Sequence, residues 1–431
     1  MMKTGLHLFL VLLIYGLLSC KSEVFLPPSL VFLEPLPQSV FYSGDTIRIK
    51  AEIKAERPIT EIQLDLLNEA GTPLGPKKTT YPDRKTLLYD SFIVLDDVPF
   101  TTGNHRIRLW VKDGESEKRK YQNVFLEHAP LQTQAYVMAE YLSTQSKVLV
   151  WFDKFLTEQS RDTLGGDHLG LRQIPGNDLL FVSGKVSGAL EARSIDGFNL
   201  IWKVNAIPNP PSPYFTFLNP GLKKFLLVGF ADGFVRVYRP DGLTEASILL
   251  KEGCYAANAL LAEGFLLVDE VSRFSSSRYL SIYYYPSGSL YYRISQGLDT
   301  KALIQRAQDY LWVGNNEVGG AEIRSLVLYP NIENVLVRYL GTAMSAAVFT
   351  EEGVLFFTTD TDLYRYDPAG DVLQLLPPSG GGHFLFVDPA MEVLGVVGDS
   401  CLSLVSLNNG LEVAKYRGNH NTFDAAVILR P

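Results

Sequence analysis

One pattern recurs along residues 133–431 and restricts the folds that the chain can adopt. An apolar run is followed by a second strand, a polar-glycine turn and a third strand, most clearly in Leu179–Gly184, Gly188–Arg193 and Leu200–Val204. The apolar runs start at intervals of 39 to 46 residues: Tyr136, Leu179, Phe225, Phe265, Tyr310, Val354 and Val393. This spacing is typical of the four-stranded blades of a β-propeller. Seven blades are therefore expected; six or eight remain alternatives because the copy at Tyr136 is weak.

The last apolar run of the chain indicates how the ring closes. Most of the repeat starts are preceded by another short strand: Tyr214–Phe217, Ala257–Leu261, Ala302–Arg306, Ala346–Thr350 and Phe384–Val387. Phe423–Leu429 has the same character, yet no repeat follows it, and the copy at Tyr136 lacks a clear strand of its own before it. We expect this last run to be the innermost strand of the first blade, which removes the exposed edges of an open array.

Residues 30–128 follow a different pattern, in which apolar and polar residues alternate. The alternation predicts half-buried strands around these inward-pointing residues: Ile47, Ile49, Ala51, Ile53, Ile62, Leu64, Leu66, Phe92, Val94, Ile107, Leu109 and Val111. Turn signals such as Ser43-Gly44-Asp45 and Asp113-Gly114 separate the strands. About seven short strands in about 100 residues indicate a β-sandwich.

Two segments resemble known all-β families. Gly103–Gly114, a glycine-led strand that runs into an Asp-Gly turn, resembles bacterial immunoglobulin-like modules, which most often act as spacers; Trp110 is then expected in the core. The Leu179–Val204 repeat resembles that of pyrroloquinoline-quinone-type propellers. Enzymes of that class use adjacent cysteines, and this chain has none. The resemblance implies an all-β immunoglobulin-like sandwich followed by a quinoprotein-like propeller, without the quinone chemistry.

The start of the chain has the order of a secretory signal. A basic start, Met1–Gly5, precedes the uncharged run Leu6–Ser19, which is too short to span a bilayer. Leu17-Leu18-Ser19-Cys20 resembles the lipobox of bacterial lipoproteins. The resemblance implies that residues 1–19 are a signal peptide, that Cys20 carries a lipid, and that residues 20–29 are a tether. The mature protein is then an outer-membrane lipoprotein on the periplasmic or the cell-surface side.

Charge and cysteine content narrow the possible partners. A net charge of −8 argues against nucleic acid, which binds basic surfaces. Cys254 and Cys401 lie in different repeats and are expected to be free thiols, although an oxidising compartment would allow a bridge. The spacing of the histidines and cysteines fits no zinc motif.

No catalytic motif stands out, and we expect no catalytic residue, metal site or cofactor. Five acidic residues are nearest to the expected channel by position: Glu263, Asp269, Glu270, Asp309 and Glu352. Asp360, Asp362 and Asp367 could suggest a calcium loop, but we interpret them as a polar turn between two strands. Gly380–His383 is either a connector or a place of close ligand approach. Tyr283–Tyr285, Tyr291 and Tyr292 serve either blade packing, which we favour, or recognition.

These observations favour a non-catalytic lipoprotein that binds or scaffolds other envelope proteins through a propeller face. The nearest functional analogy is the propeller lipoprotein of the outer-membrane β-barrel assembly machinery, an analogy of fold alone. The alternative is capture of a glycan or small ligand at the cell surface, as an accessory to nutrient uptake. A glycan lyase or hydrolase is the third possibility; it needs two acidic residues, or a base with a charge stabiliser, converging in the channel.

Overall fold

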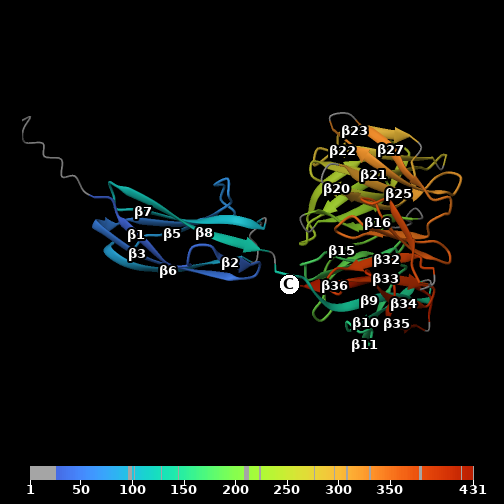
Figure 1. Cartoon of the computed structure of the whole chain (residues 1–431), viewed down its shortest axis with the longest axis horizontal. Helices are drawn as coiled ribbons and strands as arrows, with labels where there is room; N and C mark the ends of the chain where they lie inside the picture. Colours follow the sequence, from blue (N-terminus) through green and yellow to red (C-terminus); the bar gives the residue numbers. More distant parts are fainter. Residues whose placement is uncertain are drawn as a thin grey trace, which may run out of the picture. The chain divides into compact units, whose positions relative to one another are not determined.

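The computed structural model of the chain is all-β (Figure 1). It describes residues 26–95, 100, 102–127, 129–143, 145–207, 213–222, 225–275, 277–295, 297–306, 309–329, 332–377, 381–418 and 420–430. Cys20 and the signal-like segment lie outside these ranges. No helix within them is long and apolar enough to cross a membrane. The chain divides into two compact units, with the boundary between Pro130 and Leu131.

The described residues of the first unit form two β-sheets. Its strands are β1 (Ser29–Glu34), β2 (Ser39–Tyr42), β3 (Thr46–Ile59), β4 (Glu61–Leu67), β5 (Lys78–Thr80), β6 (Arg84–Val94), β7 (Gly103–Lys112) and β8 (Glu117–Glu127). One sheet has the order β1-β3-β6 and the other β2-β8-β7-β4-β5. β2 pairs with β8 in parallel, and the remaining ladders are antiparallel.

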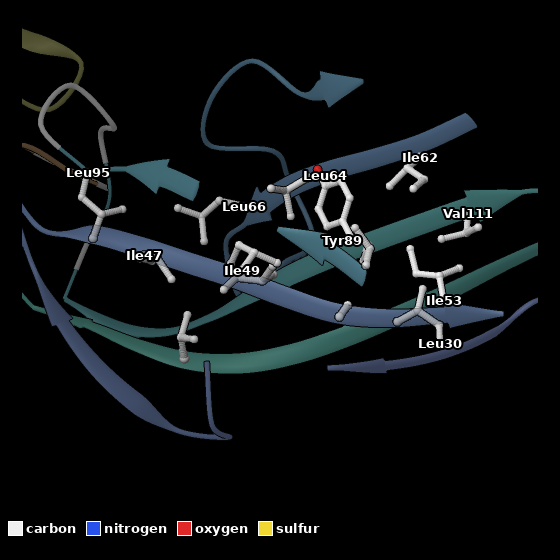
Figure 2. Packing of buried hydrophobic residues seen from close by; sticks show 14 of the residues in the cluster. Leu30, Ile47, Ile49, Ile53, Ile62, Leu64, Leu66, Tyr89, Leu95 and Val111 are labelled. Atoms are coloured by element: carbon white, nitrogen blue, oxygen red, sulfur yellow. The ribbon is translucent and has the colours of Figure 1, made fainter. Parts of the chain in front are cut away.

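The two sheets enclose one apolar core, to which β3, β4 and β7 contribute most of the side chains. Ile47, Ile49 and Ile53 of β3 face Ile62, Leu64 and Leu66 of β4 across the space between the sheets (Figure 2). The three β3 isoleucines are fully buried. Period-two alternation predicts these inward positions correctly, because each of these strands is apolar on one face only.

On β6 the alternation points the other way from what we expected, whereas on β7 Ile107, Leu109 and Val111 are buried as expected. Phe92 and Val94 are 52% and 40% exposed, and Tyr89 and Ile93 of the same strand face the core. Lys78 lies over the Phe92 ring at 3.8 Å on the outer face. Trp110 also stands outside the core, because its neighbours along β7 take the inward positions.

The second unit is a β-propeller. Its described residues form seven antiparallel sheets of four strands each, which we number propeller sheets 1 to 7. From the inside outwards, sheet 1 is β36 (Thr422–Arg430), β9 (Gln132–Ser143), β10 (Ser146–Phe152) and β11 (Glu158–Gly165); sheet 2 is β12 (Gly170–Gln173), β13 (Leu179–Ser183), β14 (Leu190–Ser194) and β15 (Leu200–Val204); sheet 3 is β16 (Phe215–Pro220), β17 (Leu226–Phe230), β18 (Phe234–Tyr238) and β19 (Thr244–Leu249).

The remaining sheets repeat this arrangement. Sheet 4 is β20 (Cys254–Ala262), β21 (Phe265–Ser272), β22 (Arg278–Tyr284) and β23 (Leu290–Ser295); sheet 5 is β24 (Asp299–Gln305), β25 (Tyr310–Asn315), β26 (Ala321–Val327) and β27 (Glu333–Tyr339); sheet 6 is β28 (Ala346–Phe349), β29 (Leu355–Thr358), β30 (Leu363–Asp367) and β31 (Val372–Leu375); sheet 7 is β32 (Phe384–Asp388), β33 (Val393–Gly398), β34 (Cys401–Ser406) and β35 (Glu412–Arg417).

The seven innermost strands form a closed circle. Contacts run in order from β36 to β12, β16, β20, β24, β28, β32 and back to β36. β36 pairs with β9, so that the end of the chain completes the sheet in which the propeller begins (Figure 1). This confirms the expected position of the last apolar run. Apolar clusters fill the spaces between neighbouring sheets, which gives every sheet two buried faces.

Polar side chains join neighbouring sheets next to the innermost strands. The Asp269 carboxylate of sheet 4 accepts a hydrogen bond from the Thr300 amide of sheet 5 at 3.3 Å. Asn315 of sheet 5 bonds the backbone of Met344, just before sheet 6, at 2.8 and 2.9 Å. Thr358 of sheet 6 donates to the Gly382 carbonyl at 2.6 Å. These bonds satisfy buried backbone groups where the chain passes between sheets.

Candidate functional site

The innermost strands of the propeller surround a cavity of about 980 Å³. All seven of these strands contribute to its wall, so the cavity lies at the centre of the ring. Small side chains line it on four of them, namely Ala259, Ala302, Ala347 and Ala426. Since these residues end at Cβ, the centre stays open, and the volume lies within the range of small-molecule sites in proteins.

Sheets 3 to 5 provide a polar part of the wall. The Asn219 side-chain amide of β16 donates to the Asn258 Oδ1 of β20 at 2.6 Å and to the Ala259 carbonyl at 3.1 Å. Thr300 and Lys301 of β24 continue this part of the wall, and the Lys301 ammonium pairs with Asp299 at 3.0 Å. Amides and hydroxyls in this arrangement present hydrogen-bonding groups to the cavity.

Sheets 6 and 7 provide an aromatic part of the wall. It consists of four phenylalanines: Phe349, Phe356, Phe384 and Phe386. Arg172 of β12 places its guanidinium 4.6 Å from the centre of the Phe384 ring. The cavity thus combines aromatic side chains on one part of its wall with amides on another. Such a combination suits a ligand that has both an apolar face and hydrogen-bonding groups.

The charge of Arg172 is compensated inside the protein. Its guanidinium lies 2.9 Å from Asp424, which is 3% exposed and also accepts a hydrogen bond from the Leu171 amide at 2.7 Å. His168 lies 3.6 Å from the same carboxylate, and burial lowers the pKa of this histidine. This group joins sheets 1 and 2 at the cavity wall, and its charges balance one another.

Two of the five acidic candidates are buried away from the cavity. Asp269 is 2% exposed and pairs with Arg278 at 2.7 Å; burial raises its pKa to about 6, against the opposing effect of the arginine. Glu270 is fully buried, lies 3.0 Å from the Arg293 guanidinium and accepts a hydrogen bond from the Tyr283 hydroxyl. Both carboxylates therefore hold sheet 4 together internally.

The other three acidic candidates are dispersed. Asp309 bonds Arg306 at 2.7 Å, which lowers the pKa of the carboxyl, and it also accepts from Ser325. Glu263 is exposed in the turn between β20 and β21. Glu352 is exposed, and it is the one member of the five that lines the cavity. The structure thus does not bring these carboxylates together as an acid–base pair.

Backbone packing accounts for Gly381 of the glycine cluster, and local hydrogen bonds account for Asp362 and Asp367 of the aspartate-rich turn. Gly380 lies outside the described residues; a Cβ on Gly381 would stand 2.0 Å from the Asp360 carbonyl, so that close backbone packing requires glycine there. His383 lines the cavity. Asp362 bonds Thr361, and Asp367 caps the turn at the Ala369 amide. Across the described part of the chain, no group of three or more His, Cys, Asp or Glu residues could hold a metal ion.

The tyrosines of sheet 4 divide between packing and exposure. Tyr283 is 3% exposed and belongs to the core between sheets 3 and 4. Tyr284 is 44% exposed and packs against Phe265 and Tyr291, with ring centres 5.5 and 5.0 Å apart. Tyr292 is 46% exposed. Cys254, which is buried in the same sheet, is a free thiol, as is Cys401.

Comparison with known proteins finds no match to any family model and no match among curated sequences. Solved structures with related architecture include a quinonprotein alcohol dehydrogenase-like protein from Bacteroides thetaiotaomicron. It is 12% identical, with a TM-score of 0.47, over 92% of this chain and 98% of that one. AztD from Citrobacter koseri, solved in its apo form, is 8% identical with a TM-score of 0.46, over 68% and 98%.

A third solved structure is hydrazine synthase from Kuenenia stuttgartiensis. It is 11% identical, with a TM-score of 0.44, over 56% of this chain and 77% of that one. The assignment of a propeller therefore rests on the sheets and ladders of the chain itself.

Proposed function

We propose that this protein is an exported, membrane-anchored lipoprotein that binds other envelope proteins through its propeller and is not an enzyme. In this proposal a lipid on Cys20 holds residues 20–29 at the outer membrane. Residues 30–128 are an immunoglobulin-like spacer, and residues 133–431 are a seven-bladed propeller. The seven four-stranded sheets and their contact circle support the blade count.

The observation that carries the non-catalytic role is the internal use of the buried acids. Asp269, Glu270 and Asp424 each pair with an arginine or with backbone amides inside the propeller. A lyase or hydrolase needs carboxylates or other titratable groups that converge on a substrate. Carboxylates engaged in this way stabilise the sheets of a rigid binding disc instead.

The outermost strand of sheet 5 supports a protein partner. β27 pairs with β26 along one edge and carries exposed apolar side chains: Val335 at 55%, Leu336 at 53%, Val337 at 41% and Tyr339 at 55%. An exposed apolar edge strand offers both backbone hydrogen bonds and apolar contact to an extended segment of another protein. We propose that such a segment of an envelope protein adds to this edge.

Crosslinking in cells tests this role. The native lipoprotein is crosslinked, solubilised in detergent, purified and examined by mass spectrometry beside a Cys20→Ala variant. A reproducible membrane partner that the Cys20→Ala variant loses supports an anchored scaffold.

A second pair of variants tests the surface. Leu336→Lys on β27 is expected to lose the partner, whereas Val413→Lys, at a 61% exposed site on β35, is expected to keep it. Absence of any partner for an abundant, accessible lipoprotein would contradict the scaffold role, and equal capture by the two lysine variants would contradict the β27 surface.

The cavity favours a second candidate, the capture of a glycan or small ligand. Phe349 and Phe384, which are partly exposed, supply rings for stacking, and Asn219 and Asn258 supply the hydrogen-bonding groups that a sugar uses. Titration of the full-length protein with soluble oligosaccharides tests this alternative.

A further inference from the structure

Arg365 of β30 occupies a place between propeller sheets that other sheets fill with apolar residues. It pairs across the ladder with Phe356, which belongs to the apolar cluster shared by sheets 6 and 7. Directly opposite residues in an antiparallel ladder share a face, so Arg365 points towards sheet 7. The residues at the corresponding place in sheets 2, 3, 4 and 7 are buried and apolar, namely Ala192, Val237, Ile282 and Leu404.

The guanidinium of Arg365 lacks the partner that other arginines of third strands have. Arg193 and Arg324 each pair with a glutamate two residues earlier, at 2.7 and 2.6 Å. At the equivalent position before Arg365 stands Leu363, which is fully buried. Within the described residues, Arg365 forms no hydrogen bond or ion pair, and its side chain lines the central cavity.

Three carboxylates also line the cavity but leave Arg365 unpaired. Glu351 and Glu352 are exposed in the turn between β28 and β29. Glu392 is exposed between β32 and β33, and it accepts a hydrogen bond from Asn408 at 3.0 Å. These groups remain hydrated, whereas Arg365 is half-buried and lies directly across the ladder from Phe356.

An uncompensated guanidinium in an apolar wall selects for a particular ligand chemistry. Its planar fork matches a carboxylate in a bidentate pair, and the pair is stronger where water is excluded. Phe356 lies directly across the ladder from Arg365, and Phe384 and Phe386 of sheet 7 line the same cavity. Phe356 and Phe386 are buried, so Phe349 and Phe384, which are partly exposed and line the same cavity, supply the ring faces on which a flat apolar group packs.

We infer that the cavity binds a small organic acid that has a ring, with its carboxylate on Arg365 and its ring on the phenylalanine wall. A sugar acid and an aromatic acid share this chemistry. The inference goes beyond the scaffold role and rests on the ligand-capture alternative, since it names the kind of ligand that the cavity takes.

Calorimetric titration of the full-length protein in detergent tests the inference with two pairs of probes. The pairs are D-glucuronate with D-glucose, and benzoate with benzamide. At least one acid is expected to bind at least about tenfold more tightly than its uncharged counterpart. The better of the two acids identifies the source of the ring, and Arg365→Gln is expected to remove the preference for the charged member.

Matched variants separate this role from a structural one. Arg236→Gln removes another third-strand arginine, which pairs with Asp232 at 3.7 Å and lies outside the cavity wall. The Arg236→Gln variant is expected to bind the probes as tightly as the wild type does. Arg365→Lys keeps the charge and is expected to retain the preference for the acid. This variant still tests the inference if Arg365→Gln does not fold.

The outcomes distinguish the inference from the proposal beneath it. Equal binding of acid and uncharged probe, or an unchanged preference in Arg365→Gln, would overturn the inference but leave ligand capture standing. No binding of any of the four probes would overturn the inference, and a further absence of binding to neutral oligosaccharides would remove ligand capture as well.

Discussion

The Tyr136 hydroxyl donates a hydrogen bond to the Asp388 carboxylate at 2.6 Å, joining the sheets at the beginning and the end of the propeller. Tyr136 lies on β9 of sheet 1 and Asp388 on β32 of sheet 7, and both side chains are fully buried. Thr133 donates to the same carboxylate, at 2.7 and 2.8 Å. The junction at which the ring closes is thus held by a buried, charged hydrogen-bond group in addition to the β36–β9 ladder.

Removal of the hydroxyl tests the contribution of this bond. Tyr136→Phe is expected to lower the free energy of unfolding by about 1.5 to 3 kcal/mol, the usual range for a hydrogen bond to a charged group. Chemical denaturation measures the change. Tyr364→Phe is a control on a half-buried tyrosine of sheet 6, and it is expected to change stability much less. Equal stability of wild type and Tyr136→Phe would contradict a role for the bond in closure.

Asp269 is expected to make the protein less stable as the pH rises from about 4 to about 6. Burial raises its pKa from 3.8 in the unfolded chain to about 6, so the folded protein holds the proton more tightly between these values. The contribution of this carboxyl is fully present below about pH 4 and is lost as the pH rises through 6, by about 3 kcal/mol.

Asp269→Asn removes this titration while keeping the shape of the side chain. Denaturation at several pH values measures the unfolding free energy of both proteins. From pH 4 to pH 6.5 the wild type is expected to lose unfolding free energy relative to the variant. A difference that stays constant over this range would show that the folded and unfolded chains titrate alike at Asp269.

The repeated strands were predictable because their signal is local and occurs many times. Each second strand of the propeller contains a short apolar run, since both of its faces are buried between neighbouring sheets. The last strand was predictable because Phe423–Leu429 had the right character and the first sheet lacked a partner. Both inferences needed only strand length, spacing and the cost of an open edge.

Alternation failed where both faces of a strand are apolar. On β6, Leu88 and Phe92 point outwards, and Leu87, Tyr89 and Ile93 point inwards. Apolar residues recur with a period of two on both faces, so the pattern does not say which face is buried. Only the partner sheet decides which face is buried. The resemblance to immunoglobulin-like modules implied a core position for Trp110, and the register of β7 places it on the opposite face.

The site was harder to predict because its chemistry depends on partners. Sequence position marked Asp269 and Glu270 as candidates but could not show that Arg278 and Arg293 pair with them. A single arginine in a strand, such as Arg365, carries no signal by itself. A comparison of the repeats carries its signal, since arginine stands there where Ala192 or Val237 stands in other sheets.

Lys147 of β10 is expected to produce a rise in stability at alkaline pH. Its side chain is 3% exposed and donates to the Asp167 carbonyl at 2.7 Å, and burial lowers its pKa from 10.5 to about 8. Between these values the unfolded chain binds the proton and the folded chain releases it, so stability increases as the pH rises from 8 to 10.5, by about 3 kcal/mol. Lys147→Met is expected to abolish the rise in denaturation experiments; an identical pH profile in the variant would contradict the assignment.

A loop of sheet 2 wraps around Asp167. The Asp167 carboxylate accepts hydrogen bonds from the amides of Val186, Ser187 and Gly188, at 2.6, 3.1 and 2.7 Å. A Cβ on Gly188 would stand 2.7 Å from the Asp167 carbonyl and 2.8 Å from the Gly184 Cα. Both neighbours are backbone atoms, so they cannot move aside without breaking the loop's hydrogen bonds.

Gly188→Ala is therefore expected to lower the free energy of unfolding by about 1 to 3 kcal/mol, the usual cost of overpacking. Gly165→Ala is the matched control: it lies just before the same loop region, has open space around its Cβ position and does not need a positive φ. Thermal and chemical denaturation of both variants measure the difference. Because alanine favours the folded state at a compatible site, Gly165→Ala is expected to be neutral or slightly stabilising. If the two alanines had equal effects, the close approach of the loop to Asp167 would not be what requires glycine at position 188.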